Sequence, residues 1–479
     1  MKFVGRSRQL ADLDKWYSAV TAGGSGLMVA VRGRRQVGKS RLYTEFLRRR
    51  RLPHLFFTAI KGGSASMQMQ AVRRDASSSI PPIPDCDALF AAAPANWTDV
   101  FGRLRMSAEK GPIVVVLDEF PWAVEADPSL EGELQSAWDR HLQQLPVLLV
   151  LVGSDISMME RLTLHDRPLY GRAREDRVHP FNPAEVAAAL GAGISAIGAF
   201  DSYLVTGGYP RLVADAQRAG DLRSYVRQGF SDENSDLVVV AQRSLDAEFP
   251  PDAQARRILS AIGGQEVGMP TFSSVLGGFD ERVGSAAGVA ITRSLRILGQ
   301  QKGVVSIEVP AGSAPNSKLR RYRVSDPYLR FWFRFVEPYL PHIARGRSDV
   351  ALDAFDLHWS SWRGRAIEPE VHSALERLAP NTPVLASTTS IGSWWNRDNS
   401  VEVDIVAVSR RQVTSVGTIK WRERKAISGA EVSALAQARN TIPNAAGADL
   451  IAVCPAGLRP GVQIDGLFTA DDLLTAWSA

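Results

Sequence analysis

A glycine-rich segment between an apolar run and a helix-like stretch has the spacing of a phosphate-binding loop. Its residues, Gly33-Arg34-Arg35-Gln36-Val37-Gly38-Lys39-Ser40, fit the pattern G-x-x-x-x-G-K-[ST] in full. Glycine lets the backbone turn tightly around a phosphate, and the loop amides and the next helix N-terminus face the anion. Lys39 can reach the β- and γ-phosphates, and the Ser40 hydroxyl can ligate Mg²⁺. We therefore expect residues 33–41, ending with Arg41, to bind a nucleotide; an ordinary glycine-rich turn would leave Lys39 unexplained.

Two acids follow a second apolar run. Residues 113–117 are too continuously apolar to form a strand with a wet face, and Asp118-Glu119 come directly after them. Asp118 would hold the metal, and Glu119 would position and polarise the attacking water. The alternative is that the two acids only close a strand and cap the next helix. Beside a phosphate-binding loop, an Asp-Glu pair favours hydrolysis over passive nucleotide binding.

Further apolar runs predict the elements that must position these groups. Residues 27–31 and 146–152 indicate more buried strands, and helical periodicity lies between the strands. The predicted fold class is therefore α/β, with the parallel sheet of a P-loop NTPase over residues 1–181. The run at 146–152 ends in Gly153-Ser154, so Ser154 is a candidate sensor of the γ-phosphate or the water. The alternative is that Ser154 caps the next helix.

Arginines outside the loop could also approach a nucleotide. Arg6 precedes the first predicted helix and is a candidate to touch the nucleotide or to cap its site; the alternative is a surface arginine before a core helix. Arg172, with Arg174 as second choice, could act as a finger on a neighbouring subunit's γ-phosphate; the alternative is a loop salt bridge. Arg211 follows a Gly-Gly-Tyr-Pro turn in a predicted helical lid, residues 182–248, and could approach the phosphates from there.

Residues 249–335 resemble a winged helix-turn-helix in outline. The predicted third helix exposes Arg293 and Arg296, which are candidate phosphate contacts. The predicted wing adds four basic residues, namely Lys318, Arg320, Arg321 and Arg323. Winged helices also serve only to join domains, so both a DNA contact and a purely structural role stay open. A Trp/Phe-rich stretch at the end of this range, residues 328–335, is expected to be a core or interface helix.

The C-terminal block, residues 350–479, carries an incomplete metal constellation. Glu368 on a predicted helix, Asp404 on one strand and Lys420 on the next have the layout of a metal-dependent nuclease core. Thr418 stands where a second strand carboxylate is expected, and Glu402 or Glu431 could substitute for it. Both an active nuclease and a nuclease-like fold retained for binding remain open.

Composition excludes several classes of protein. The chain has 479 residues, 45% hydrophobic and 22% charged, with a net charge of +5. This composition is globular, and its basic balance favours a polyanionic partner unless it only reflects genomic base composition. Two distant cysteines, Cys86 and Cys454, provide no disulfide framework. We find no signal peptide and no membrane span, so we expect a cytoplasmic protein without membrane contact.

Together these segments resemble a known group of proteins. Residues 3–6, 33–40, 118–120, 168–172 and 207–210 resemble archaeal-type ATPases of the AAA+/STAND P-loop NTPase superfamily. Residues 325–332 and the Glu368/Asp404/Lys420 set resemble the PD-(D/E)XK nuclease-like domain often fused to them. The resemblance implies ATP rather than GTP, a helical lid, a winged helix and a restriction-endonuclease-like fold. Thr418 departs from the acid that is usual in that nuclease-like domain.

Three functions follow as hypotheses. The first is an ATP-hydrolysing, Mg²⁺-dependent switch that couples nucleotide state to binding of double-stranded DNA or a protein partner by the C-terminal domains. The second is an ATP-gated nuclease that cuts DNA with Glu368, Asp404 and Lys420. The third is a regulator in which ATP is a structural ligand and is not hydrolysed. A homo-oligomer would follow if Arg172 acts on a second subunit.

Overall fold

The fold is known from a computed structural model. It describes residues 3–154, 156–162, 164–249, 254–265, 269–279, 285–410 and 412–477. The chain forms two compact units, Met1–Pro180 and Phe181–Ala479. Among the described helices, none combines the length and apolarity needed to cross a bilayer.

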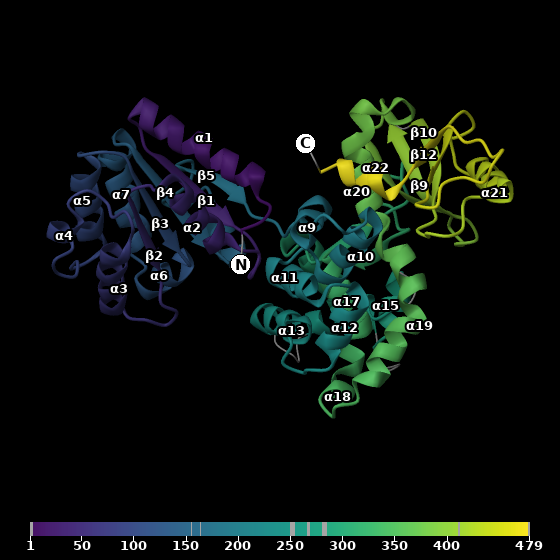
Figure 1. Ribbon diagram of the computed structural model, residues 1–479, viewed down its shortest axis with the longest axis horizontal. Helices are drawn as coiled ribbons and strands as arrows, with labels where there is room; N and C mark the ends of the chain where they lie inside the picture. Colours follow the sequence, from purple (N-terminus) through teal and green to yellow (C-terminus); the bar gives the residue numbers. More distant parts are fainter. Residues whose placement is uncertain are drawn as a thin grey trace. The chain divides into compact units, whose positions relative to one another are not determined.

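The first unit contains a five-stranded parallel sheet with the order β2-β3-β4-β1-β5 (Figure 1). The strands are β1 (Leu27–Arg32), β2 (His54–Thr58), β3 (Ile113–Asp118), β4 (Val147–Gly153) and β5 (Ala173–Arg177). β3 and β4 are buried along their whole length, as their continuous apolar runs predict. The parallel P-loop type of sheet is confirmed, but β5 was not predicted. Its sequence, Ala-Arg-Glu-Asp-Arg, is charged and largely exposed at the edge of the sheet, so it has no apolar signature.

Helices cover both faces of this sheet. They are α1 (Ser7–Gly23), α2 (Lys39–Arg50), α3 (Ala65–Ser78), α4 (Cys86–Leu89), α5 (Trp97–Ala108), α6 (Phe120–Ala126), α7 (Leu130–Arg140) and α8 (Ile156–Leu162). The core on one face is built from α3, α5, α6 and α7 (Figure 1). On the other face α1 packs against β4 and α2. α3 lies in a stretch rich in serine, alanine and proline, residues 61–97, and is capped by the Ser64 side chain.

The second unit begins with a helical segment. Its helices are α9 (Pro183–Leu190), α10 (Ala196–Thr206), α11 (Pro210–Ala219), α12 (Leu222–Phe230) and α13 (Asp236–Glu248). The turn between α10 and α11 is the Gly-Gly-Tyr-Pro motif. Gly208 has a φ of 70°, and a Cβ there would collide with the carbonyl oxygen of Phe181. Only glycine fits this position.

Short helices and a β-hairpin follow. They are α14 (Gln254–Gly263), α15 (Phe272–Gly277), α16 (Ser285–Arg296) and the antiparallel strands β6 (Val305–Glu308) and β7 (Arg321–Val324). α17 (Pro327–Phe335) comes next and is almost entirely buried, with its aromatic rings among other aromatic side chains. The aromatic segment is therefore a core helix, as expected.

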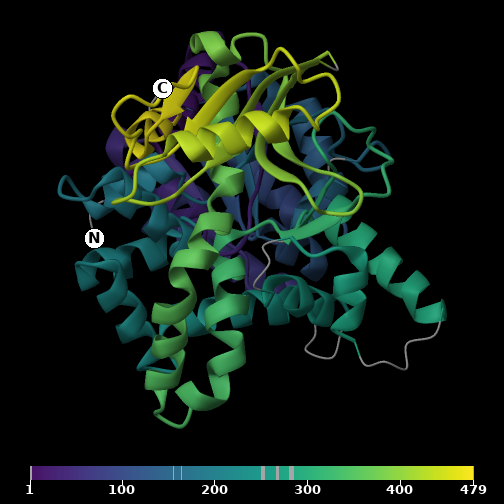
Figure 2. The same ribbon diagram turned by 90° about the vertical axis from the view of Figure 1, so that its right-hand side faces the viewer.

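The C-terminal part contains a mixed sheet with the order β12-β11-β10-β9-β8. Its strands are β8 (Ser390–Trp395), β9 (Glu402–Ser409), β10 (Gln412–Ile419), β11 (Asp449–Val453) and β12 (Gly466–Phe468). β8, β9 and β10 are antiparallel neighbours, whereas β11 runs parallel to β10 and β12 parallel to β11. The helices near it are α20 (Glu368–Leu378), α21 (Gly429–Arg439) and α22 (Ala470–Thr475). α18 (Leu340–Ile343) and α19 (Ser348–Ala366) come before this sheet in the sequence, and α19 packs against α12 and α17. α21 lies across one face of the sheet (Figure 2).

Two sequence motifs of the second unit contact each other. The Tyr209 hydroxyl donates to Asp326 Oδ2 over 2.7 Å, and the rings of Tyr209 and Tyr328 meet edge to face with centroids 5.7 Å apart. Asp326 also caps α17 through the amide of Leu329. The Gly-Gly-Tyr-Pro turn and the start of α17 therefore form one packed junction.

Candidate functional site

The glycine-rich loop joins the carboxyl end of β1 to α2. Gly33 is buried, and a Cβ there would collide with the carbonyl oxygen of Val178, so only glycine fits. Gly38 has a φ of 86° and precedes the first residue of α2, Lys39. Val37 is fully buried and fixes the loop to the core. The residues of the loop and first helical turn that stay exposed are Arg35, Gln36, Ser40 and Arg41, and Arg34 is half-buried.

Lys39 lies inside the loop. Its side chain is buried, and Nζ donates to the carbonyl oxygens of Gly33 over 2.7 Å and Arg34 over 3.0 Å. Burial lowers the pKa of Lys39 to about 8, although the nearby Glu119 and Asp118 act in the opposite direction. The ammonium group is thus held at the centre of a loop shaped to surround an anion.

Ser40 and Asp118 come together from positions 78 residues apart. The Ser40 hydroxyl donates to Asp118 Oδ2 over 2.7 Å, at the carboxyl end of β3. Burial raises the pKa of Asp118, and the Ser40 hydrogen bond only partly counteracts this effect. A buried carboxylate is costly without a cation nearby, so this pair of oxygen atoms suits a hard cation.

Glu119 lies next to this pair and contacts the adjacent strand end. The Ser154 hydroxyl, directly after β4, donates to Glu119 Oε2 over 2.9 Å. Glu119 has a φ of 52° and precedes the first residue of α6. The sequence suggested Ser154 as a sensor, but it gave no sign that its partner would be Glu119. The contact arises because β3 and β4 are neighbours and end at the same edge.

Arg6 is not a surface residue. Only 2% of it is exposed, and its guanidinium donates to the carbonyl oxygens of Val37 over 2.7 Å and His179 over 2.6 Å. Arg6 therefore ties the glycine-rich loop to the segment after β5. These contacts span 31 and 173 residues, so nothing local in the sequence could predict them.

The remaining arginine candidates have partners within their own unit. Arg172 makes two hydrogen bonds to Asp139, of 2.8 and 2.7 Å, and also donates to the carbonyl oxygens of Pro168 and Tyr170. The Arg174 guanidinium lies 5.1 Å from the centroid of the Trp16 ring. Arg211 forms an ion pair with Asp236. The salt-bridge alternative thus describes Arg172 as it stands.

We expect the ATP affinity of this site to fall as the pH rises through about 8. Lys39 has a pKa of about 8, and bound phosphates would favour its ammonium form. Binding above this pH must therefore take up a proton, whereas binding well below it should not. Calorimetric titration of Mg²⁺-ATP at about pH 7 and about pH 9, in buffers of different ionisation enthalpy, measures this uptake. Equal uptake at both values would contradict the prediction.

The C-terminal candidates form a second polar cluster. Glu368 is buried at the start of α20 and makes a 3.0 Å ion pair with Arg323 of β7. Arg323 also donates to Glu308 over 3.1 Å and to the carbonyl oxygen of Arg365 over 3.1 Å. Burial raises the pKa of Glu368 to about 7, although Arg323 lowers it. Glu368 lies on a helix, as predicted, and is its first residue, because α19 ends at Ala366 and α20 begins at Glu368.

The Asp404 carboxylate accepts a hydrogen bond from Thr418, the residue that stands where a second acid is expected. Its Oδ2 atom accepts from the Thr418 hydroxyl over 2.9 Å and from the Ile419 amide over 2.8 Å. Lys420 follows β10 directly and is half-buried, and its backbone amide donates to Val453. Thr418 thus donates a hydrogen bond to Asp404 at the position where a second carboxylate would help to bind metal.

Neither Glu402 nor Glu431, the two acids that could replace the missing carboxylate, completes the cluster of Glu368 and Asp404. Glu402 pairs with Arg321 over 2.9 Å, and Glu431 caps α21 while pairing with Arg422 over 3.0 Å. Within the described ranges, no three acidic, histidine or cysteine side chains gather closely enough to hold a metal ion.

Comparisons with known proteins support an ATPase domain. Residues 3–214 match a family described as an ATPase domain predominantly from Archaea, and residues 332–432 match one described as archaeal and bacterial proteins of unknown function. An uncharacterized protein of Methanocaldococcus jannaschii is 23% identical over 408 residues, which cover 83% of each chain. The Walker-type ATPase of Pyrococcus abyssi superposes with a TM-score of 0.50 and 16% identity, over 69% of this chain and 96% of that one.

These matches confirm part of the predicted resemblance. The match over residues 3–214 confirms an archaeal-type ATPase domain and supports binding of ATP. The structural likeness, at low identity, shows a shared fold. The C-terminal match has no functional description and does not test the nuclease-like resemblance.

Proposed function

We propose that the first unit binds ATP with Mg²⁺ and hydrolyses it, as a switch for the C-terminal part of the chain. The observation that carries the proposal is the 2.7 Å contact between Ser40 and Asp118 beside the buried Lys39. An ordinary glycine-rich turn would not bring a lysine, a hydroxyl and a carboxylate together at the carboxyl ends of parallel strands.

The residues present fit a magnesium ion. Mg²⁺ in nucleotide sites is bound by one or two carboxylates together with phosphate oxygens and water. Asp118 and Ser40 supply a carboxylate and a hydroxyl, so a cluster of three acids is not required. When bound, the ion would neutralise charge on the β- and γ-phosphates.

The other groups act on phosphate and water. Lys39 exchanges its bonds to the loop carbonyls for bonds to phosphate oxygens. Glu119 accepts a hydrogen bond from the attacking water and orients it for in-line attack. Ser154 holds one oxygen of Glu119 and so positions the carboxylate, leaving its other oxygen for the water. In a homo-oligomer, Arg172 could contact the γ-phosphate bound to a second copy only after its ion pair with Asp139 breaks.

We further propose that residues 249–335 form a winged helix and that the C-terminal part binds double-stranded DNA. The order α14, α15, α16 and then the β6–β7 hairpin supports the winged helix. Arg293 and Arg296 are exposed on α16, as a phosphate-contacting helix requires. A protein partner is the alternative occupant of this surface.

The proposal includes a restriction-endonuclease-like fold but not DNA cleavage. Three antiparallel strands followed by a parallel one, with α20 before them and α21 before β11, support that fold. Against cleavage, Arg323 neutralises Glu368, and Thr418 donates to Asp404 where a second acid would help to bind metal. The cluster therefore supports a fold retained for binding.

The test is ATP hydrolysis by the full chain. We expect turnover that requires Mg²⁺ and rises when duplex DNA is added, and we expect the DNA effect to weaken at higher salt. Turnover that ignores DNA at both salt concentrations would indicate a protein partner instead. ATP binding without any turnover would leave only the regulator that does not hydrolyse ATP.

A further inference from the structure

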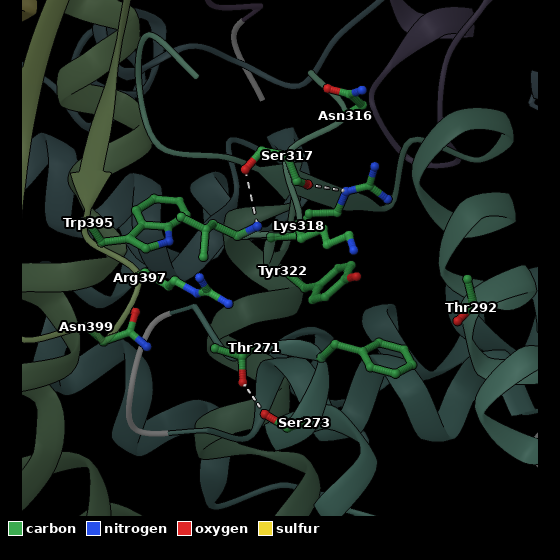
Figure 3. A pocket seen from close by; sticks show the side chains of 13 residues that line it. Thr271, Ser273, Thr292, Asn316, Ser317, Lys318, Tyr322, Trp395, Arg397 and Asn399 are labelled. Atoms are coloured by element: carbon green, nitrogen blue, oxygen red, sulfur yellow. Dashed lines mark hydrogen bonds between the residues drawn. The ribbon is translucent and has the colours of Figure 1, made fainter. Parts of the chain in front are cut away.

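A pocket of about 510 Å³ lies between two elements of the second unit. One wall is the loop that leads into β7, with Asn316, Lys318 and Arg320, and the other is the turn between β8 and β9, with Arg397. Figure 3 shows Lys318 and Arg397 reaching into the same hollow from these two elements, with Ser317 above and Ser273 below. The two walls come from segments about 80 residues apart in the sequence, so the pocket exists only in the folded unit.

The charged residues that line this pocket are all positive. Three of the residues that line it are cationic, Lys318, Arg320 and Arg397, and none is acidic. All three are exposed. Arg320 Nε donates to the backbone oxygen of Ser317 over 3.1 Å, while the described residues include no acid paired with Lys318 or Arg397. Uncompensated cations that converge on a polar hollow favour an anionic ligand.

The two walls are held in a fixed relation by a buried arginine. Arg321 of β7 donates to Glu402 of β9 over 2.9 Å and to the Asn399 side chain over 3.0 Å. Its guanidinium also lies 4.3 Å from the centroid of the Trp395 ring. The two segments that carry the cations are therefore held together before any ligand arrives, which lowers the entropic cost of binding.

Two of the three aromatic residues of the pocket are too buried to stack on a base. Stacking of unpaired bases requires exposed ring faces. Trp395 and Tyr322 are only 2% and 6% exposed, so their rings offer no stacking platform, and Phe272 is the third ring in the lining and is half-buried. The exposed groups of the lining are the three cations with hydroxyl and amide side chains, and groups of these kinds contact a phosphate backbone.

We propose that this pocket, between the loop before β7 and the β8–β9 turn, binds the phosphate backbone of duplex DNA. The inference rests on the proposed binding of DNA by the C-terminal part and assigns its location. It places contacts on both the winged-helix segment and the C-terminal sheet, so that one strand of the duplex bridges the two.

The test compares two matched double variants of the full chain. Lys318→Ala with Arg397→Ala removes the two cations of the pocket, and Arg424→Ala with Lys425→Ala removes an exposed arginine and lysine after β10. Binding of a labelled duplex is measured by fluorescence anisotropy over a range of salt concentrations. For the pocket variant we expect affinity lower by on the order of tenfold, and a salt dependence whose slope falls by about 1 for each residue. The control variant and basal ATP hydrolysis should stay near wild type.

Each of the other outcomes of this binding experiment contradicts a different part of the proposal. If wild type binds duplex DNA and both variants bind equally well, the pocket is not the contact, although the DNA function stands. If wild type does not bind duplex DNA, the proposed DNA function fails and this inference fails with it. If single-stranded DNA competes better than duplex, the assignment to duplex DNA is wrong.

Discussion

Replacing Glu119 by glutamine is expected to lower ATP turnover by about 10²- to 10⁴-fold while ATP still binds. Glutamine keeps the size of the side chain and can still accept from Ser154, whose hydroxyl lies 2.9 Å from Glu119 Oε2. It removes the negative charge that polarises the attacking water. Because Ser40, Asp118 and Lys39 are untouched, the nucleotide site should stay intact, and the variant should retain ATP.

Steady-state hydrolysis and direct ATP binding separate the two effects. Ser154→Ala is the matched control, since it removes the hydroxyl that positions Glu119 but leaves the carboxylate, and it should reduce turnover less than Glu119→Gln does. Turnover by Glu119→Gln equal to wild type would show that Glu119 does not act on the water. Lower ATP affinity without slower turnover would instead assign Glu119 to binding.

Replacing Lys39 by alanine is expected to weaken ATP binding by about a hundredfold or more. Lys39 would give up two hydrogen bonds to loop carbonyls, of 2.7 and 3.0 Å, for charge-assisted bonds to phosphate. Bonds of that type are worth about 1.5–3 kcal/mol each, and two of them give at least this loss of affinity. Titration of Mg²⁺-ATP by calorimetry measures the change.

The control for this variant is Lys15→Ala, which removes an exposed lysine of α1 with the same change in charge. It should bind ATP as wild type does. If Lys39→Ala keeps wild-type affinity and folds normally, the loop does not bind phosphate through this lysine, and the proposed nucleotide site is wrong.

Local sequence predicted the centre of the candidate site because its chemistry follows strand ends. Gly33 and Asp118 each come at the carboxyl end of a buried strand, and parallel strands end at one edge of a sheet. When this rule is applied to the apolar runs at 27–31, 113–117 and 146–152, it predicts that Lys39, Ser40 and Asp118 lie close together. The parallel sheet itself was predicted for the same reason, since its central strands are uniformly apolar.

Features without a local signal were missed. β5 is charged and has no apolar pattern, so only its pairing with β1 identifies it as a strand. The contact of Arg6 with the glycine-rich loop depends on a backbone φ of 63° and on partners far along the chain. The pairing of Arg323 with Glu368 joins a hairpin strand to a helix 45 residues later. Long-range pairs of this kind are set by tertiary packing, which a single sequence does not reveal.

The buried helix α17 has a consequence for how the chain could be divided. It packs against α10, α13, α14 and α19, Arg330 donates to the backbone of Ala366, and Trp332 donates to that of Val238. Cutting the chain on either side of α17 would expose most of its aromatic surface and leave buried donors without acceptors. The helices from α10 to α19, residues 196–366, should therefore unfold as one cooperative block, although they contain several recognisable segments. Recombination could exchange this block only as a whole, and the winged-helix segment could not be transplanted alone.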